Sequence, residues 1–157
     1  MSGGHVLERA AGVPAEGPLA EALATRARLM ELTEASHEAA LMPAEPGGLP
    51  HDLRAALACR MTRIAGTAAL ADHYAAMAPG HPLASPDAAG SDAREAAILA
   101  YVDKVTRSPR DATPDDIDAL RDGGVAEGDI VRLAGLVAFV NYQLRVAVVL
   151  DALGEGA

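Results

Sequence analysis

The chain has 157 residues, of which 50% are hydrophobic and only 3% aromatic, and it carries a net charge of -9 at pH 7. This length and hydrophobic content fit one globular domain with a core of Ala, Leu and Val, and they exclude a disordered chain. The acidic balance argues against duplex DNA or an anionic membrane as partner, and the single cysteine excludes an intramolecular disulfide and a multi-cysteine metal site.

The N-terminal third changes from an irregular segment to a helical pattern. Residues 1–15 contain Gly and Pro without periodicity, which predicts a flexible tail. From Pro18 to Met42 apolar residues recur every three or four positions, which predicts one helix with Pro18 in its first turn. Residues 43–50, rich in Pro and Gly, end this pattern.

Two shorter helices are predicted next. One covers about residues 50–64 and ends at Gly66. Thr67 can cap the following helix, which reaches about Met77. Residues 78–91 then form a long loop, and loops of this length inside a compact domain are often functional.

Helix start signals divide the C-terminal half. Asp92 and Glu95 form a capping-box pattern. Residues 113–116 combine a capping hydroxyl, a first-turn Pro and acidic side chains. The last predicted helix covers about residues 128–153 and is apolar on more than one face, which indicates burial at the centre of the protein or in an oligomer interface.

The sequence predicts a soluble, cytoplasmic protein. The uninterrupted uncharged run of the last helix, residues 133–144, is shorter than the roughly 20 residues of a membrane span. No signal peptide is visible near the N-terminus. We expect an all-α fold of about six helices, with one domain over residues 16–157 behind the tail of residues 1–15.

Three stretches carry a resemblance to a known family: "RAALACRMTRIAG", "LADHY" and "AILAYVDKVTRSPRDATPDDIDALRDGGVAEGDIVRLAGLVAFVNYQLRV". Their order resembles the carboxymuconolactone decarboxylase / alkylhydroperoxidase AhpD-like superfamily, and most closely its peroxidase-related branch. The similarity covers about residues 19–153. It implies an AhpD-like helical bundle that assembles into homotrimers or hexamers.

The peroxidases of this family carry the motif E-x11-C-x2-C-x3-H. Aligned on His73, the Glu position is Arg54 and the two Cys positions are Gly66 and Ala69. The peroxidase cycle requires two thiols, because one takes the oxygen and the other resolves the sulfenic acid. The resemblance therefore implies the fold and the proton-handling His73, without thiol peroxidase activity.

His73 is the first candidate for chemistry, since a histidine is a ready acid or base near pH 7. Its neighbours Asp72 and Tyr74 point in other directions on a helix and are not automatic partners. The alternative is a partly buried His73 that makes one structural hydrogen bond. Cys59, the only thiol, lies among apolar positions and is expected to be a core residue rather than a reactive thiolate.

Polar residues on two apolar helices are candidates for a binding pocket. Arg60 either binds an anionic ligand or forms a structural ion pair, the alternative we favour, while Arg54 and Arg63 are expected to be solvated. In the last helix Asn141 and Arg145 share a face.

Asn141, Tyr142 and Arg145 need polar partners, because an unpaired buried polar group costs about 1–3 kcal/mol. They line a pocket or link subunits. We group them with Arg60 and Tyr74 as pocket candidates.

The first predicted helix carries a polar cluster with spacing that a weak metal site could use. Its members are Glu31, Glu34, Ser36, His37 and Glu38. Without a distant ligand, a solvated face is the favoured interpretation. We expect no metal and no cofactor.

Three functions remain open from the sequence. The first is an AhpD-like protein without the cysteine pair that binds or acts on a small molecule near His73. The second is a decarboxylase-type enzyme that uses His73 as acid or base and an Arg for a carboxylate. The third is a non-catalytic subunit of an oligomer, alone or with a catalytic paralogue. We expect a homo-oligomer (dimer, trimer or hexamer) and a small-molecule ligand, without nucleic acid or membrane as partner.

Overall fold

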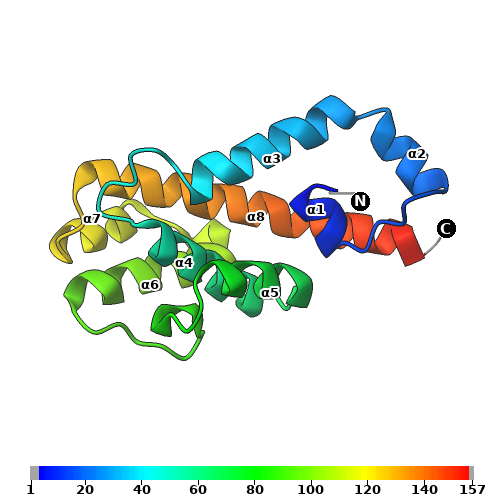
Figure 1. The fold of residues 1–157 in the computed structure, drawn as a ribbon. Helices are drawn as coiled ribbons and strands as arrows, with labels where there is room; N and C mark the ends of the chain where they lie inside the picture. The colour runs from blue at the N-terminus through cyan, green and yellow to red at the C-terminus, as the bar shows by residue number, and fades with distance from the viewer. Residues whose placement is uncertain (1–3, 156–157) are drawn as a thin grey trace.

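The protein is a bundle of α-helices (Figure 1). The computed structural model describes residues 4–155, and within that range it contains no strand. The described range forms eight α-helices and two short 3-10 helices: α1 (Val6–Ala10), α2 (Pro18–Ala24), α3 (Ala27–Leu41), α4 (His51–Ile64), α5 (Ala68–Met77), η1 (Pro82–Ala84), α6 (Ala93–Arg107), η2 (Pro109–Asp111), α7 (Pro114–Asp122) and α8 (Glu127–Glu155). The all-α prediction is confirmed, with eight α-helices in place of about six.

The N-terminal segment differs from the predicted flexible tail. Val6–Ala10 form α1, and its side chains Val6 and Leu7 are buried in the main core. The backbone N–H of Val6 donates to the carboxylate of Glu34 on α3 at 2.9 Å. A five-residue helix is too short to show helical periodicity in a sequence, so its burial could not be read from the pattern.

The single helix predicted from Pro18 to Met42 is also wrong. The chain breaks at Thr25, whose hydroxyl donates back to the Ala22 carbonyl at 2.6 Å. The break lets Leu19 of α2 pack on Leu150 near the end of α8, while Met30 of α3 joins the main core. Two separate apolar contacts therefore divide one periodic stretch into two helices.

The centre of the bundle is α4, which is buried on all sides rather than on one face. Every residue from Leu53 to Thr62 is buried. Helices α3, α5, α6 and α8 and the turn η1 all pack against it. The small side chains Ala55, Ala56 and Ala58 allow this close approach from several directions.

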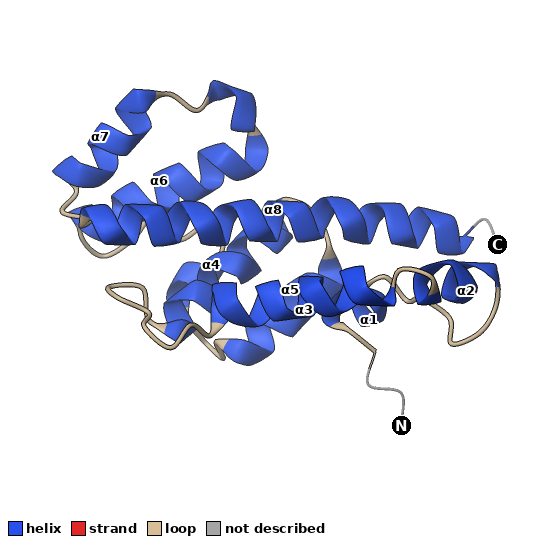
Figure 2. Ribbon diagram, turned by 90° about the horizontal axis from the view of Figure 1, so that it is seen from above, coloured by secondary structure: helices blue, strands red, loops and turns tan. Residues whose placement is uncertain are grey.

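The longest helix, α8, runs along the whole molecule (Figure 2). Helices α1, α3, α4, α6 and α7 pack on it. Within residues 4–155 it is the one helix whose length and apolar composition would suffice to cross a membrane, and half of its most apolar window is buried in the bundle. Core helices of soluble proteins meet the same criterion, so this finding does not place the protein in a membrane.

The structure confirms part of the predicted start and stop signals: Thr67 precedes α5 as expected, but its side chain makes no capping hydrogen bond. Gly66 adopts φ +76° after α4, a conformation that favours glycine. Asp92 accepts a hydrogen bond from the Glu95 N–H at 2.8 Å, but the Glu95 carboxylate binds the N–H of Ser91 rather than that of Asp92. Thr113 begins α7 as predicted, with Pro114 in the first turn and the Thr113 N–H donating to the Asp116 carboxylate at 2.7 Å.

Candidate functional site

The structure pairs His73 of α5 with His37 of α3. Their Nε2 atoms lie 3.1 Å apart, so one imidazole donates and the other accepts. The prediction of a solvated face is wrong for His37, which is only 8% exposed. Met30, Thr33, His37 and Leu41 form the buried stripe of α3, and their three-to-four spacing was the sequence signal that could have found His37.

Two fully buried side chains, Tyr74 and Gln143, extend the contacts of the histidine pair into the core. The Tyr74 ring stacks on the His37 ring, with centroids 5.8 Å apart and planes 20° apart. The Tyr74 hydroxyl donates to Oε1 of Gln143 on α8. Nε2 of Gln143 has no hydrogen-bond partner among the residues that the structure describes. Sequence reasoning missed Gln143, because nothing local distinguishes it from the other polar residues of α8.

Burial keeps both histidines neutral. Burial lowers the pKa of His37 from its ordinary value of 6.5, and Arg9 lowers it further, while Glu34 and Glu38 raise it. Burial also lowers the pKa of His73, assisted by His37 and Arg9 and opposed by Glu34. At pH 7 the pair is therefore uncharged, so the partly exposed His73 can accept a proton and become an imidazolium.

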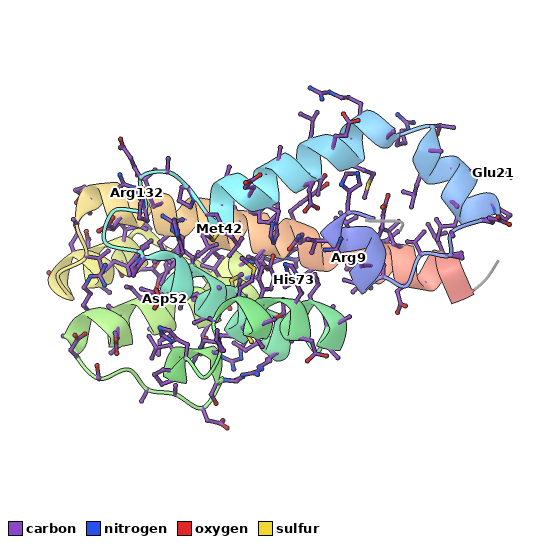
Figure 3. The ribbon with its side chains drawn as sticks, viewed as in Figure 1. Arg9, Glu21, Met42, Asp52, His73 and Arg132 are labelled. Carbon is purple, nitrogen blue, oxygen red and sulfur yellow. The ribbon has the colours of Figure 1, made fainter. Side chains whose placement is uncertain are left out.

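Helix α1 supplies the wall next to this pair. Glu34 accepts the Val6 N–H bond and lies 3.8 Å from Nδ1 of His5. Figure 3 labels Arg9 of α1 and His73 of α5 near one another, where the two helices pack together. The segment expected to be a flexible tail is thus part of the candidate site.

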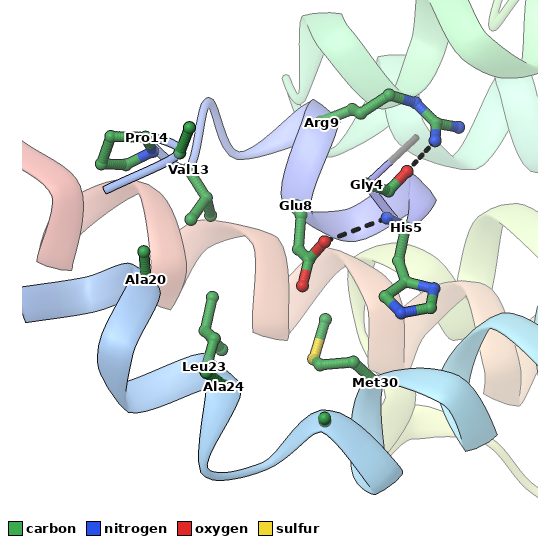
Figure 4. A pocket seen from close by; sticks show the side chains of 12 residues that line it. Gly4, His5, Glu8, Arg9, Val13, Pro14, Ala20, Leu23, Ala24 and Met30 are labelled. Carbon is green, nitrogen blue, oxygen red and sulfur yellow. Dashed lines mark hydrogen bonds between the residues drawn. The ribbon is translucent and has the colours of Figure 1, made fainter. Parts of the chain in front are cut away.

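A cavity of about 540 Å³ opens between α1, α2 and α3 (Figure 4). His5, Glu8 and Arg9 line it on one side, and Leu23 and Met30 line it on the other. Small-molecule sites commonly have volumes of about 300–1,000 Å³. Neither His37 nor His73 lines this cavity, and the link between the two is helix α1, which borders the cavity and packs against α5.

Arg60 forms the structural ion pair that the sequence favoured. Its Nε and Nη2 donate to the Asp103 carboxylate at 2.6 and 2.9 Å. The guanidinium also donates to three backbone carbonyls of the loop after η1: Ser85, Pro86 and Ala88. All of its nitrogens are engaged, so Arg60 is not available for a ligand.

Arg54 is buried, and the expectation that it is solvated is wrong. Its guanidinium donates to the carbonyls of Leu49 at 2.7 Å, Ala40 at 2.9 Å and Pro46 at 3.0 Å. Arg54 therefore holds the end of α3 and the following loop against α4. Arg63 is exposed and donates to the Ala84 carbonyl at 3.0 Å.

The other two motif positions lie beside a turn. Gly66 follows α4 in that turn, and Ala69 is exposed in the first turn of α5. Neither position carries a side chain that could take part in acid–base chemistry.

The three candidates on α8 do not join His73. The Asn141 amide donates to the Val137 carbonyl at 3.0 Å, and Arg145 donates to the Asn141 carbonyl at 2.8 Å. Both line a separate groove of about 410 Å³ beside Thr67 and Thr106. The Tyr142 hydroxyl lies 3.1 Å from that of Thr33 on the α3 side of α8. Of the five pocket candidates, only Tyr74 lies at the histidine pair.

The interpretation of Cys59 as a core residue is confirmed. Its side chain is fully buried, and its thiol donates to the Ala71 carbonyl at 3.5 Å. Burial raises the pKa of the thiol, assisted by Asp72 and opposed by Arg63. The thiolate that peroxide chemistry needs is therefore disfavoured at this position.

Comparisons of this chain with known protein families, with curated proteins and with solved structures each found no match. Its relation to the AhpD-like superfamily therefore stays a prediction that rests on helix order and on His73. Within residues 4–155 no three His, Cys, Asp or Glu side chains are arranged to hold a metal ion.

We expect the histidine pair to make the protein less stable in mild acid. The unfolded histidines have a pKa of about 6.5, and both folded values are lower, so the unfolded state binds more protons below that pH. Stability is complete above about pH 6.5 and is lost as the pH falls toward the folded values. Urea unfolding of the wild type and of the His37→Gln/His73→Gln variant across this range measures the effect. Equal pH dependence in the two proteins would contradict it.

Proposed function

We propose that this chain is a small-molecule-binding protein of AhpD-like fold that lacks the redox cysteine pair and uses the His37–His73 pair to handle a proton. The observation that carries the proposal is the 3.1 Å contact between two imidazoles from different helices. Lowered pKa values keep both rings neutral, which is the state a general base requires.

The two histidines take different roles in this proposal. His73 is partly exposed, so it exchanges the proton with the bound molecule. His37 is buried between His73 and Tyr74 and acts as a positioning residue that fixes the tautomer of His73. A fixed tautomer determines which ring nitrogen accepts and which donates, and this control is a common feature of catalytic histidines.

Arg9 favours a small anionic ligand. Arg60, for which anion binding was the less favoured alternative, is fully engaged with Asp103 and backbone carbonyls. Arg9 is exposed on α1, lines the cavity, and acts electrostatically on both histidines. A carboxylate at the edge of that cavity would bind the Arg9 guanidinium in place of the Gly4 carbonyl, which accepts a hydrogen bond from Arg9 Nη1 in the structure, and a decarboxylase-type reaction requires such an anion site near its acid–base group.

We further propose that the protein works in the cytoplasm as a homo-oligomer. Its acidic charge and the apolar face of α8 support this proposal. A non-catalytic role as an oligomer-forming subunit is the alternative that the same face favours. Thiol peroxidase activity is not proposed, since the only thiol is buried.

Incubation with a panel of small carboxylated lactones and simple carboxylates tests the proposal. The readouts are CO2 release and the NMR shifts of the histidine side chains. Removing a general acid–base residue lowers turnover by roughly 10²-fold or more, so we expect such a loss in His73→Gln and a smaller loss in His37→Gln. A ligand that binds without reaction should shift both histidine resonances.

His81→Gln is the matched control, because the His81 ring accepts a bond from the Leu83 N–H in η1, away from the pair. It should behave as wild type. Unchanged binding and turnover in His73→Gln would overturn the proposal. So would hydroperoxide turnover with a thiol reductant that stops in Cys59→Ser.

A further inference from the structure

A groove runs between α3 and α8, which pack side by side (Figure 1). Its wide end is a hollow of about 580 Å³. The hollow continues along α3 into a second one of about 250 Å³, since Ser36 and Phe139 line both. On α3 the groove reaches from Ala40 to Leu29, which is about 16 Å at the rise of an α-helix. Most of its wall is apolar: Leu29, Leu32, Ala40, Pro43, Leu136 and Phe139.

The wide end of the groove carries a buried positive charge. Arg54 lines the hollow and is only 3% exposed. A guanidinium has five N–H donors, and three of those of Arg54 bind the carbonyls of Leu49, Ala40 and Pro46. Among the residues that the structure describes, the other two donors have no acceptor, and no carboxylate forms an ion pair with Arg54. A buried cation without a counter-ion is costly, so a carboxylate at this point would be stabilising.

A second guanidinium increases this demand for an anion. Arg132 of α8 lines the same hollow. Burial lowers the pKa of Arg54, and the charge of Arg132 lowers it further, while Asp129 raises it. Asp129 is already shared by Arg132 at 3.2 Å and Arg94 at 3.9 Å. Three guanidinium groups therefore depend on one buried carboxylate, which leaves positive charge unbalanced at the hollow.

We propose that this groove binds a free fatty acid, with the carboxylate between Arg54 and Arg132 and the linear chain along α3 toward Leu29. Guanidinium groups bind carboxylates through paired hydrogen bonds, and the unused donors of Arg54 supply them. The larger hollow has the volume of a typical small-molecule site. A chain in the groove would also cover Leu29 and Leu32, which are 54% and 48% exposed.

Glu45 is the acidic member of the lining, and it sets the strength of binding. Its side chain is exposed and forms no ion pair within the described residues. Its carboxylate therefore repels a bound anion without neutralising the buried guanidinium. The net charge of -9 likewise disfavours an anionic bilayer surface as the source of the carboxylate, whereas a single free acid fits between the two helices.

The proposal does not rest on the proposed function. No residue that lines the groove lines the cavity at Arg9. The nearest link to the histidine pair is Phe139, whose ring meets that of His37 edge-on with centroids 6.1 Å apart. Loss of fatty-acid binding would thus leave the acid–base proposal standing, and the reverse also holds.

Isothermal titration calorimetry of the full chain with octanoate tests the proposal. Octanol supplies the chain without the charge, and acetate supplies the charge without the chain. We expect saturable binding of octanoate, with both other probes weaker by about 10-fold or more. Octanol that binds as tightly as octanoate would overturn the proposal. So would binding of wild type to phosphatidylglycerol vesicles without binding of free octanoate, which would indicate a membrane surface.

Arg132→Gln should raise the dissociation constant of octanoate about 10- to 100-fold, the range expected for a charged hydrogen bond. Arg94→Gln is the matched control, because Arg94 binds the same Asp129 carboxylate but does not line the groove. It should stay within about threefold of wild type. Glu45→Gln should bind more tightly than wild type. Arg54 is left unchanged, since it also holds the loop before α4.

Gly135→Leu blocks the groove without touching a charge. Gly135 lines the hollow, and a Cβ added there would meet open space, so leucine should fill the hollow while the chain still folds. Ala138→Leu, on an exposed part of α8 outside the lining, is its control. We expect octanoate binding to disappear in Gly135→Leu alone, with circular dichroism to verify folding. Octanoate binding that survives in both Arg132→Gln and Gly135→Leu would place the fatty acid elsewhere and overturn the proposal.

Discussion

Replacing Arg60 by Met should lower the free energy of unfolding by about 3–5 kcal/mol, the typical cost of breaking a buried ion pair from one side. The variant leaves the Asp103 carboxylate without its two closest donors. It also removes the donors that hold the Ser85 and Ala88 carbonyls. Urea unfolding at neutral pH measures the loss.

Arg107→Met is a matched control for this prediction. Arg107 binds the same Asp103 carboxylate at 3.1 Å, but from the surface and four residues away on α6. Exposed pairs of this kind contribute about 0–1 kcal/mol. Similar losses in the two variants would show that the loop contacts of Arg60 do not matter and would contradict the structural role we assign to it.

The ion pair between Arg60 and Asp103 also predicts that the free energy of unfolding falls at acid pH. Burial opposes ionisation of Asp103, but the hydrogen bonds and charges of Arg60 and Arg107 outweigh it, so the net pKa of Asp103 is lowered. Its contribution to stability is therefore complete above the unfolded pKa of about 3.9 and is lost as the pH falls through the folded value. Arg60→Met should reduce this part of the acid sensitivity.

Replacing Tyr74 by Phe should cost about 1–3 kcal/mol, because it leaves the Gln143 amide buried without any partner in the described structure. Gln143→Leu alone should cost a similar amount, since it orphans the buried hydroxyl. The double variant should be close to wild type, because replacing both partners by apolar groups removes the unmet polar atoms. Thermal or urea unfolding of the wild type, the two single variants and the double variant measures this double-mutant cycle.

Additive losses in the double variant would contradict this view of the Tyr74–Gln143 contact. The histidine pair gives a further readout. Tyr74 stacks on His37, and the Phe ring keeps that contact, so the titration of both histidines should change little. A large change would show that the hydroxyl, rather than the ring, sets their environment.

Much of the fold could be predicted because its signals are local. The start of α6 follows from Asp92, whose carboxylate accepts the Glu95 N–H, and the start of α7 follows from Asp116, whose carboxylate accepts the Thr113 N–H. The end of α4 follows from Gly66. By contrast, the break between α2 and α3 depends on Leu19 reaching Leu150, a contact across most of the chain that no local pattern contains.

In the candidate site, too, some residues could be predicted from local sequence signals and others could not. His73 was found through a motif, but its partner His37 comes from another helix and becomes visible only by following the buried stripe of α3. The sequence favoured an ion pair for Arg60 and solvent exposure for Arg54. The burial of Arg54 could not be predicted, because its acceptors are backbone carbonyls that only folding brings to its guanidinium.

The three carbonyls around Arg54 bear on how such a chain can evolve. A Glu at this position, as in the peroxidase motif, would place a carboxylate against three carbonyl oxygens that now accept hydrogen bonds. Cysteines introduced at Gly66 and Ala69 would leave that conflict in place. A variant that carried the whole peroxidase motif would therefore also need a rebuilt loop before α4, because that loop is held by the Arg54 guanidinium.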